Sequence, residues 1–271
     1  MAFSSPIREK MYRLYLEFFE VAEKKRRWNM FDDIPWDRLD RSKNSERKAR
    51  CVETFCAEEL YLPDYSSGGI ALTRSMFGAA WFQACWSYEE SKHGLVFREY
   101  LTRSGMRSEA EFANFEAIVF GKHWSLPFAS SRQMACYGAL QEVATYLAYK
   151  AQKDLAVIEG DEVLQAIFTH VSRDEAAHAG FYRAVVELEM AEDRPGTVAD
   201  LAYVIARFKM PGDGLIGDYL ERLRTTGAGI STRIFLQRGL FPTLKTLGTS
   251  RTELRLALES RGPSAEAASM A

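Results

Sequence analysis

The sequence predicts an all-α protein built around a four-helix bundle, with further helices flanking it. Long stretches carry apolar residues at helical spacing, and the 8 prolines and 18 glycines fall mostly between these stretches. No convincing series of alternating apolar and polar residues predicts strands. A pattern of glutamate and histidine also occurs twice at nearly equal spacing, and such a pattern places metal ligands on the facing helices of a bundle.

In the first half of the chain, a proline or glycine marks most of the predicted helix boundaries. Pro35 lies in the segment that follows the first helix, Pro63 ends or kinks the second, and Gly105 follows the long third helix. The predicted helices of this half are Pro6 to Arg27, Ser45 to Leu62, Thr73 to Ser104 and Glu109 to Val119.

The second half follows the same logic. The segment GKHWSLP (121–127) interrupts the helical pattern, Gly160 separates the next two long helices, and Pro195 stops the second of them. We expect residues 1–260 to form a single domain and the small, polar residues 261–271 to form a disordered tail. The predicted helices of this half are Ser131 to Glu159, Glu162 to Ala191, Thr197 to Phe208, Ile216 to Thr225 and Gly229 to Gly239.

Composition narrows the possible function classes. The 35 basic and 37 acidic residues give a net charge of −2, which does not favour nucleic acid as a partner. Four scattered cysteines indicate buried thiols in a reducing compartment, because a disulfide framework or an iron–sulfur cluster needs a different pattern. Without a signal peptide or a long apolar run, we expect no membrane span and a cytoplasmic location.

The charge is uneven along the chain. Residues 8–50 hold 13 basic and 9 acidic residues, a local net of 13 − 9 = +4, with the run Lys24 to Arg27 and the segment Arg41 to Arg50 contributing most of it. A solvated helix face is the ordinary interpretation of such a run. The functional interpretation is a docking surface for an acidic partner.

Each copy of the repeated pattern is a lone glutamate followed, after 31 or 33 positions, by Glu-x-x-His. Residues three apart lie one turn apart on the same helix face, so the last two residues of each copy can reach one ion. Four carboxylates and two imidazoles suit iron or manganese, and the four negative charges balance two divalent cations. The predicted ligands are Glu59, Glu90 and His93 in the first copy, and Glu142, Glu175 and His178 in the second. Glu59 and Glu142 complete or bridge the site.

A single Glu-x-x-His motif is usually a surface accident, and Glu89, Lys92 or Asp174 could belong to such a face. Two motifs with paired lone glutamates favour a buried site, as do large apolar residues four positions before and after each motif. We expect no metal role for His123 or His170. The flanking apolar residues are Trp86, Phe97, Val171 and Tyr182.

Five segments resemble the soluble acyl-acyl-carrier-protein desaturases, a ferritin-like di-iron family. The segments are EELYLPDY (58–65), WSYEESKHG (86–94), QEVATY (141–146), DEAAH (174–178) and FKMP (208–211). The resemblance as a whole covers roughly residues 28–245. The resemblance implies a ferritin-like bundle, two Fe²⁺ ions and O2 as co-substrate. Gly68 and Gly69 depart from the family where its helix lines the substrate channel, which leaves the substrate open.

The resemblance also implies roles for three residues near the metals. Thr145, one turn after Glu142, matches a threonine associated with oxygen activation. Asp174 matches an aspartate that is hydrogen-bonded to a ligand histidine, here His93, and Trp28 resembles a tryptophan at the end of an electron path. The alternatives are an ordinary helix threonine for Thr145 and an aromatic anchor under a loop for Trp28.

The function implied by this resemblance is the introduction of a cis double bond into a fatty acyl chain bound to acyl carrier protein. A ferredoxin-like electron donor and a homodimer are implied with it. The alternative is a related di-iron hydroxylase or N-oxygenase acting on a small or carrier-bound metabolite; a long, narrow, apolar pocket favours the desaturase and a short or polar one the alternative. Coenzyme A in place of the carrier protein stays open. An iron-storage bundle or a ribonucleotide-reductase-like radical subunit fits less well.

Overall fold

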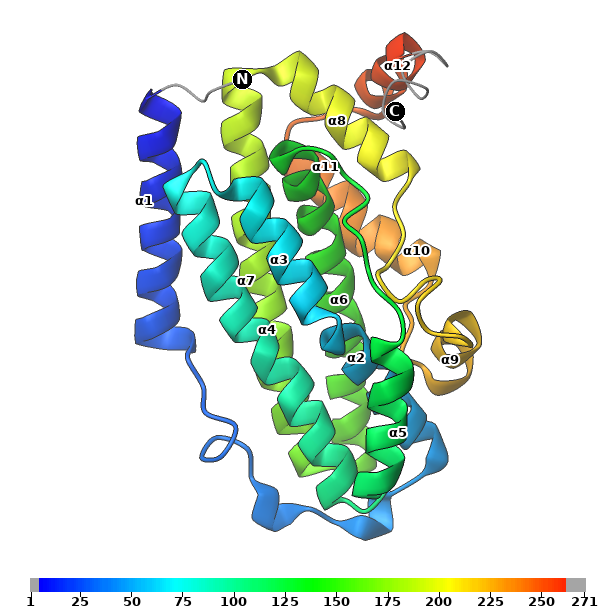
Figure 1. Ribbon diagram of the computed structural model, residues 1–271. Coiled ribbons are helices and arrows are strands. Elements are labelled where there is room, and N and C mark those ends of the chain that lie inside the picture. The colour runs from blue at the N-terminus through cyan, green and yellow to red at the C-terminus, as the bar shows by residue number, and fades with distance from the viewer. Residues whose placement is uncertain (1–4, 262–271) are drawn as a thin grey trace.

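Four long helices form the centre of the computed structural model, which describes residues 5–261 (Figure 1). They are α2 (Glu46–Leu60), α4 (Phe77–Arg103), α6 (Ser131–Glu159) and α7 (Glu162–Glu192). Helix α6 packs along α7, and α2 packs along α4. The described residues contain helices and no strands, as the sequence predicts.

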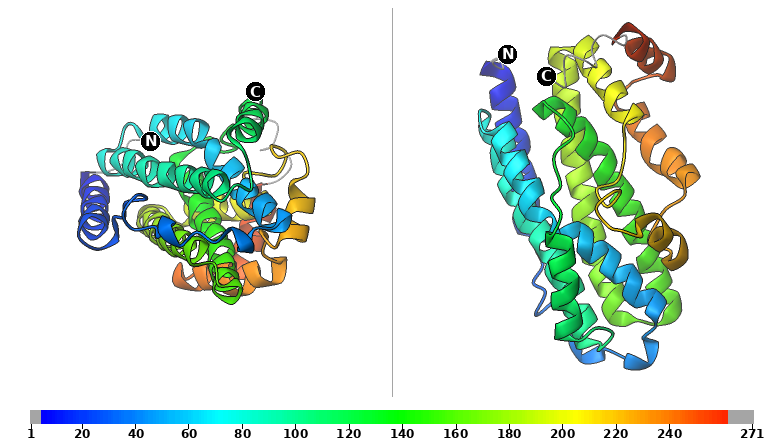
Figure 2. Two further views of the ribbon diagram at one scale, coloured as in Figure 1. Left: turned by 90° about the horizontal axis from the view of Figure 1, so that it is seen from below. Right: turned by 45° about the vertical axis from the view of Figure 1, so that its right-hand side comes forward.

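The remaining helices flank this bundle. Helix α1 (Ser5–Val21) continues into the π-helical turn η1 (Ala22–Arg26) and lies against α4 and α7, whereas α3 (Leu62–Thr73) prolongs α2 and packs on α4. Figure 2 shows the later helices gathered on the opposite side of the bundle from α1. The other elements are η2 (Trp36–Arg38), η3 (Arg41–Lys43), α5 (Glu109–Phe120), α8 (Arg194–Ala206), α9 (Tyr219–Thr226), α10 (Thr232–Ile234), η4 (Phe235–Leu240), α11 (Phe241–Thr246) and α12 (Arg251–Arg261).

A tight turn sets α6 and α7 side by side. Gly160 ends α6 with φ 67°, a left-handed conformation that glycine adopts without steric cost. The Asp161 carboxylate then accepts a hydrogen bond from the backbone N–H of Leu164 and caps α7. The turn therefore places the Glu142 face of α6 opposite the Glu175 face of α7.

Three helix predictions need correction. Helix α3 runs through Gly68 and Gly69, where the sequence predicted no helix, and Gly69 lets it approach α4, because a Cβ there would lie 2.6 Å from Gln83 Oε1. Pro195 follows the end of α7 at Glu192, but it also lies in the first turn of α8, a position that proline favours. Helix α12 was not predicted. The predicted tail lies outside the described residues except for Arg261.

Two large apolar clusters and a small third one around Tyr61 form the core of the described residues. One large cluster contains Phe82, Leu140 and Val186, and the other contains Phe97 and Phe168. The predicted metal ligands on α4, α6 and α7 lie between residues of these two clusters along each helix, and Glu59 joins them from α2. None of the described helices is both long and apolar enough to cross a bilayer.

Candidate metal centre

The six predicted ligands converge inside the bundle. They form two overlapping groups of four side chains, in each of which one ligand atom per residue lies within 4.8 Å of the others. Glu90 and Glu175 belong to both groups, so they are placed to bridge two ions. Of the two lone glutamates, Glu59 belongs to the first group and Glu142 to the second. The groups are Glu59, Glu90, His93 and Glu175, and Glu90, Glu142, Glu175 and His178.

Burial rules out a solvated surface face for this cluster. Both histidines are fully buried, Glu142 and Glu175 are each 1% exposed, and the Glu59 side chain is 10% exposed. Four carboxylates at such depth are strongly unfavourable unless cations or protons compensate them.

The unpartnered atoms of the cluster fit a pair of metal ions. Among the described residues, seven buried side-chain nitrogen or oxygen atoms have no hydrogen-bond partner, and five of them belong to the predicted ligands. Nδ1 of His178 lies 2.9 Å from Glu90 Oε1, yet the two atoms do not form a hydrogen bond. The ligand atoms of each group converge, with one atom of each residue within 4.8 Å of the others. The five are Glu90 Oε1, His93 Nδ1, Glu142 Oε2, Glu175 Oε2 and His178 Nδ1.

Without metal, the cluster holds extra protons. Burial raises the pKa of Glu59 to about 7, and the neighbouring Glu90 adds to the shift. Burial, together with Glu90 and Glu142, also raises the pKa of Glu175 well above its usual range. Burial opposes a charged His93, but the nearby carboxylates outweigh it and raise the pKa of this imidazole well above its usual value. Metal ions would displace these protons.

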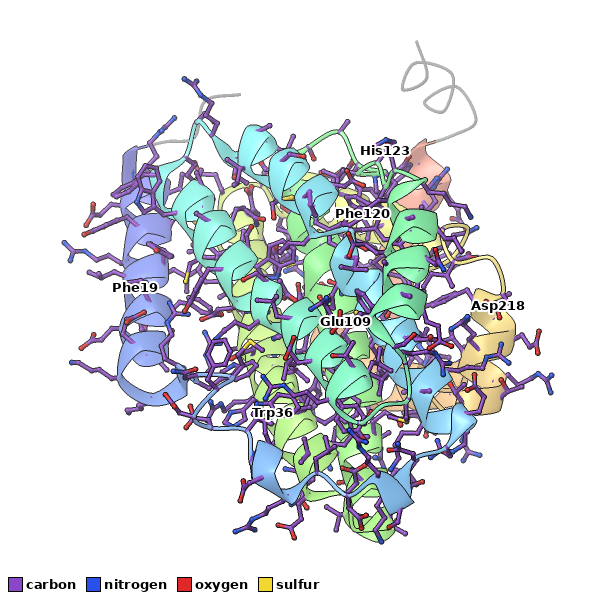
Figure 3. All side chains as sticks on the ribbon, turned by 60° about the horizontal axis from the view of Figure 1, so that its bottom comes forward. Phe19, Trp36, Glu109, Phe120, His123 and Asp218 are labelled. Carbon is purple, nitrogen blue, oxygen red and sulfur yellow. The ribbon has the colours of Figure 1, made fainter. Side chains whose placement is uncertain are left out.

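Asp174 and Trp28 lie in line behind His93. Nε2 of His93 is 3.4 Å from Asp174 Oδ2, and the Trp28 indole N–H donates to the same oxygen over 2.7 Å. His170 is half-buried and stacks on Trp28, with the ring centroids 5.1 Å apart. His123 is exposed beyond the end of α5 (Figure 3).

Glu89 is a functional residue that sequence reasoning missed. It was only one of the residues that could belong to a surface face, but it is 1% exposed and lies 2.7 Å from Nε2 of His178. Glu89 directly precedes the predicted ligand Glu90, as Asp174 directly precedes Glu175. Each contacts the histidine of the other copy: Glu89 lies beside His178, and Asp174 lies beside His93. This matched position was the available signal.

The basic run of residues 24–27 is only partly a surface. Arg26 is 6% exposed, and its guanidinium bonds Glu89 through both terminal nitrogens at 2.9 Å and Asp174 at 2.6 Å. Arg27 also donates to Glu89. Two arginines therefore balance the two outer carboxylates, which leaves the four inner carboxylates for two divalent cations. Lys92, also assigned to a possible surface face, is buried and lies over the Trp28 ring.

Hydrogen bonds also fix the two lone glutamates. The Tyr149 hydroxyl donates to Glu59 Oε1, and the Trp86 indole N–H donates to Glu142 Oε1 over 3.0 Å. Beside Glu59, burial raises the pKa of Glu58 to about 8, while a hydrogen bond from Tyr219 opposes the shift.

A cavity opens directly onto this cluster. It holds about 720 Å³ of space free of protein atoms, its mouth included, and four of the ligand glutamates line it together with Thr145. Thr145 Oγ1 donates to the carbonyl oxygen of Gln141 and accepts from the Gln141 side chain. The rest of the wall is mostly aromatic and aliphatic, but Glu58, Gln83 and Gln141 add polar groups.

Comparisons with known proteins agree with this architecture. The family model "Fatty acid desaturase" matches residues 54–225. A putative acyl-[acyl-carrier-protein] desaturase, DesA1 of Mycobacterium tuberculosis, is 28% identical over 244 residues, which span 80% of this chain and 70% of DesA1. A chloroplastic stearoyl-[acyl-carrier-protein] 9-desaturase of Arabidopsis thaliana is 29% identical over 168 residues, 61% of this chain and 41% of the plant protein.

Solved structures show the same fold. The X-ray structure of the putative acyl-ACP desaturase DesA2 from Mycobacterium tuberculosis H37Rv superposes with a TM-score of 0.67 at 17% identity, covering 93% of this chain and 99% of DesA2. A variant of R2-like ligand-binding oxidase with a Mn/Fe cofactor superposes with a TM-score of 0.57 at 16% identity, covering 89% and 94%. The predicted ferritin-like fold is thereby confirmed.

The matched stretch of the family model includes all six converging side chains and the cavity that they face. It also covers more than half of the chain. The chain therefore belongs to the fatty acid desaturase family of oxidoreductases.

Proposed function

We propose that this protein is an O2-dependent di-iron desaturase that introduces a cis double bond into a fatty acyl chain carried by acyl carrier protein. The observation that carries the proposal is a set of five unpartnered ligand atoms that converge beside a cavity, in a chain of this family. Six oxygen and nitrogen ligands without a thiolate suit iron. Manganese is the other metal that such ligands accept.

Two bound iron ions would supply the reduction of O2 and the removal of hydrogen from methylene groups, which no side chain is basic enough to deprotonate. The protein supplies the ligands and their orientation. Glu90 and Glu175 would span both ions, and the two histidines would bind one ion each. Glu89 and Asp174 hold the imidazoles by their outer nitrogens, which fixes ring orientation and tautomer. We assign Thr145 Oγ1, in the cavity wall, as a hydroxyl that holds a proton near the site of O2 reduction.

We also propose an external electron donor of the ferredoxin type, with Trp28 as the entry point. Trp28, Asp174 and His93 form a continuous line of contacts from the edge of the bundle to the predicted ligands. The variant Trp28→Phe keeps an aromatic side chain but loses the indole N–H that donates to Asp174. We expect it to slow reduction of the diferric protein by a ferredoxin while its iron content stays at the wild-type value. Stopped-flow absorbance measures the rate, and an unchanged rate would rule out this path.

The acyl carrier protein is proposed as the substrate carrier because the relatives described above are acyl-carrier-protein desaturases. An acidic carrier would meet the basic residues of the N-terminal region that stay exposed. Within the runs 24–27 and 41–50, the exposed basic residues are Lys24, Lys25, Arg41 and Lys43.

We infer that the protein is a single-domain homodimer of the cytoplasm. Free, buried cysteines fit a reducing compartment. Exposed apolar side chains recur along one face of α4, and Phe19 of α1 lines a surface depression together with Trp81 and Tyr88. Such a continuous exposed face is typical of a protein interface. The large exposed apolar residues of α4 are Phe77, Trp81, Tyr88 and Leu95.

The alternative is a related di-iron hydroxylase or N-oxygenase. One observation favours it: the cavity wall contains Glu58, Gln83 and Gln141, and these groups suit a substrate more polar than an acyl chain.

Product analysis separates the two functions. Iron-loaded protein is supplied with acyl carrier protein bearing a saturated chain, with reduced ferredoxin and with O2, and the released acids are identified by mass spectrometry. The proposal predicts a cis olefin that needs all three components. An alcohol or an N-oxide as the sole product would establish the alternative instead.

A further inference from the structure

A second cavity lies beyond the one that faces the predicted metal ligands. It holds about 440 Å³ of space free of protein atoms, the solvent at its mouth included. Its wall is mainly apolar, with Met11, Met76 and Phe181 among its residues, although the buried Glu189 also lines it. The two cavities have three lining residues in common, which are Gln83, Met134 and Tyr182. These three side chains therefore form the partition between the two spaces.

The partition is held in place by a buried hydrogen bond. The Gln83 side-chain amide donates to the Tyr182 hydroxyl over 2.9 Å, and these residues are only 2% and 5% exposed. Each polar group thus finds its partner within the wall, which removes the cost of burying either one alone. Gln83 comes from α4 and Tyr182 from α7, so the pair connects two helices of the bundle.

Two glycines provide the room for this pair. A Cβ on Gly138 of α6 would lie 2.6 Å from Cδ2 of Tyr182, so the ring rests against bare backbone. A Cβ on Gly69 of α3 would lie 2.6 Å from Oε1 of Gln83. The ring position of Tyr182 leaves no room for a larger residue at Gly138, whereas a larger residue at Gly69 would displace the end of the Gln83 side chain.

We propose that Tyr182 and Gln83 determine the length of acyl chain that the protein accepts, by ending the tunnel on the metal side of the partition. The inference rests on the proposed function and adds its specificity-determining residues. With the pair closed, the chain beyond the reacting carbons is confined to the cavity that faces the metals. Removal of the tyrosine ring joins this cavity to the apolar one and admits a longer chain.

The test measures how affinity depends on chain length. Iron-loaded protein is kept under argon, where it cannot turn over because O2 is absent. It is titrated with saturated acyl-pantetheines of increasing chain length, and displacement of a bound fluorescent fatty acid gives the affinity for each length. For the wild type, we expect affinity to rise with chain length up to a limiting length and to stay constant beyond it. For Tyr182→Ala, the rise should continue to longer chains, with about a fourfold gain for each further methylene that enters the apolar cavity.

Two further variants locate the effect. Tyr146 of α6 lines neither cavity, so Tyr146→Ala should leave the limiting length unchanged. Val185 lines only the apolar cavity, so Val185→Trp should not change the limit in the wild type but should cancel the gain in Tyr182→Ala. If Tyr182→Ala does not fold, Val185→Trp alone still tests the inference. A shorter limiting chain length in Val185→Trp than in the wild type would show that acyl chains already cross the partition in the wild type. That result would overturn the inference.

The outcomes separate this inference from the function on which it rests. Failure of the wild type to bind any acyl-pantetheine would contradict the proposed function, and the inference with it. Binding with the same limiting length in the wild type and Tyr182→Ala would contradict the inference alone.

Discussion

Replacement of Glu90 by alanine is expected to abolish the binding of both metal ions, whereas Glu59→Ala is expected to weaken the binding of one ion. Glu90 belongs to both groups of converging side chains, and Glu59 belongs to one. Loss of a shared carboxylate removes one ligand from each ion and leaves the remaining charges unbalanced in a buried site. Loss of Glu59 leaves the group around Glu142 and His178 complete.

Iron bound per chain after anaerobic loading and desalting measures this difference. Glu116→Ala is the matched control, because Glu116 is an exposed glutamate on α5 outside both groups. It should bind as much iron as the wild type. Equal iron content in Glu90→Ala and the wild type would contradict the assignment of Glu90 as a shared ligand.

The variant Arg26→Met is expected to destabilise the protein by about 3–5 kcal/mol, the usual cost of removing one partner from a buried ion pair. Arg26 contacts both Glu89 and Asp174, which are each 1% exposed, and its loss leaves these carboxylates short of positive charge. The free energy of unfolding, from urea denaturation of metal-loaded protein, gives the size of the effect.

Two comparisons test the electrostatic cause. Lys25→Met removes a neighbouring charge that is exposed and should change stability by less than about 0.5 kcal/mol. The double variant Arg26→Met with Glu89→Gln removes a carboxylate together with its cation and should recover part of the loss. A double variant that is less stable than Arg26→Met would show that packing of the arginine, and not its charge, is responsible.

The bundle was predictable because long helices with clear ends carry strong signals. The predicted helix Ser131 to Glu159 matches α6 at both ends, since a serine cap precedes it and Gly160 follows. Helix α3 was missed because Gly68 and Gly69 are poor helix formers, whereas in the structure the helix that contains them packs against α4. Local propensity cannot report such a contact.

The candidate metal site was likewise predictable from the sequence only in part. The positions of the six converging side chains followed from spacing along four helices, which the sequence shows directly. The residues behind them did not: Arg26 comes from a turn after α1, and its bonds to Glu89 and Asp174 join segments 63 and 148 positions apart. A basic run looks the same in sequence whether it faces solvent or a buried acid. The partition between the two cavities depends likewise on α4 and α7 meeting.

Crystals of iron-loaded protein, with anomalous diffraction measured at the iron edge, would test the central claim most directly. We predict two peaks about 3.5–4 Å apart, both within bonding distance of Glu90 and Glu175, with His93 at one and His178 at the other. A single peak, or two peaks at the protein surface, would contradict a di-iron centre at this position.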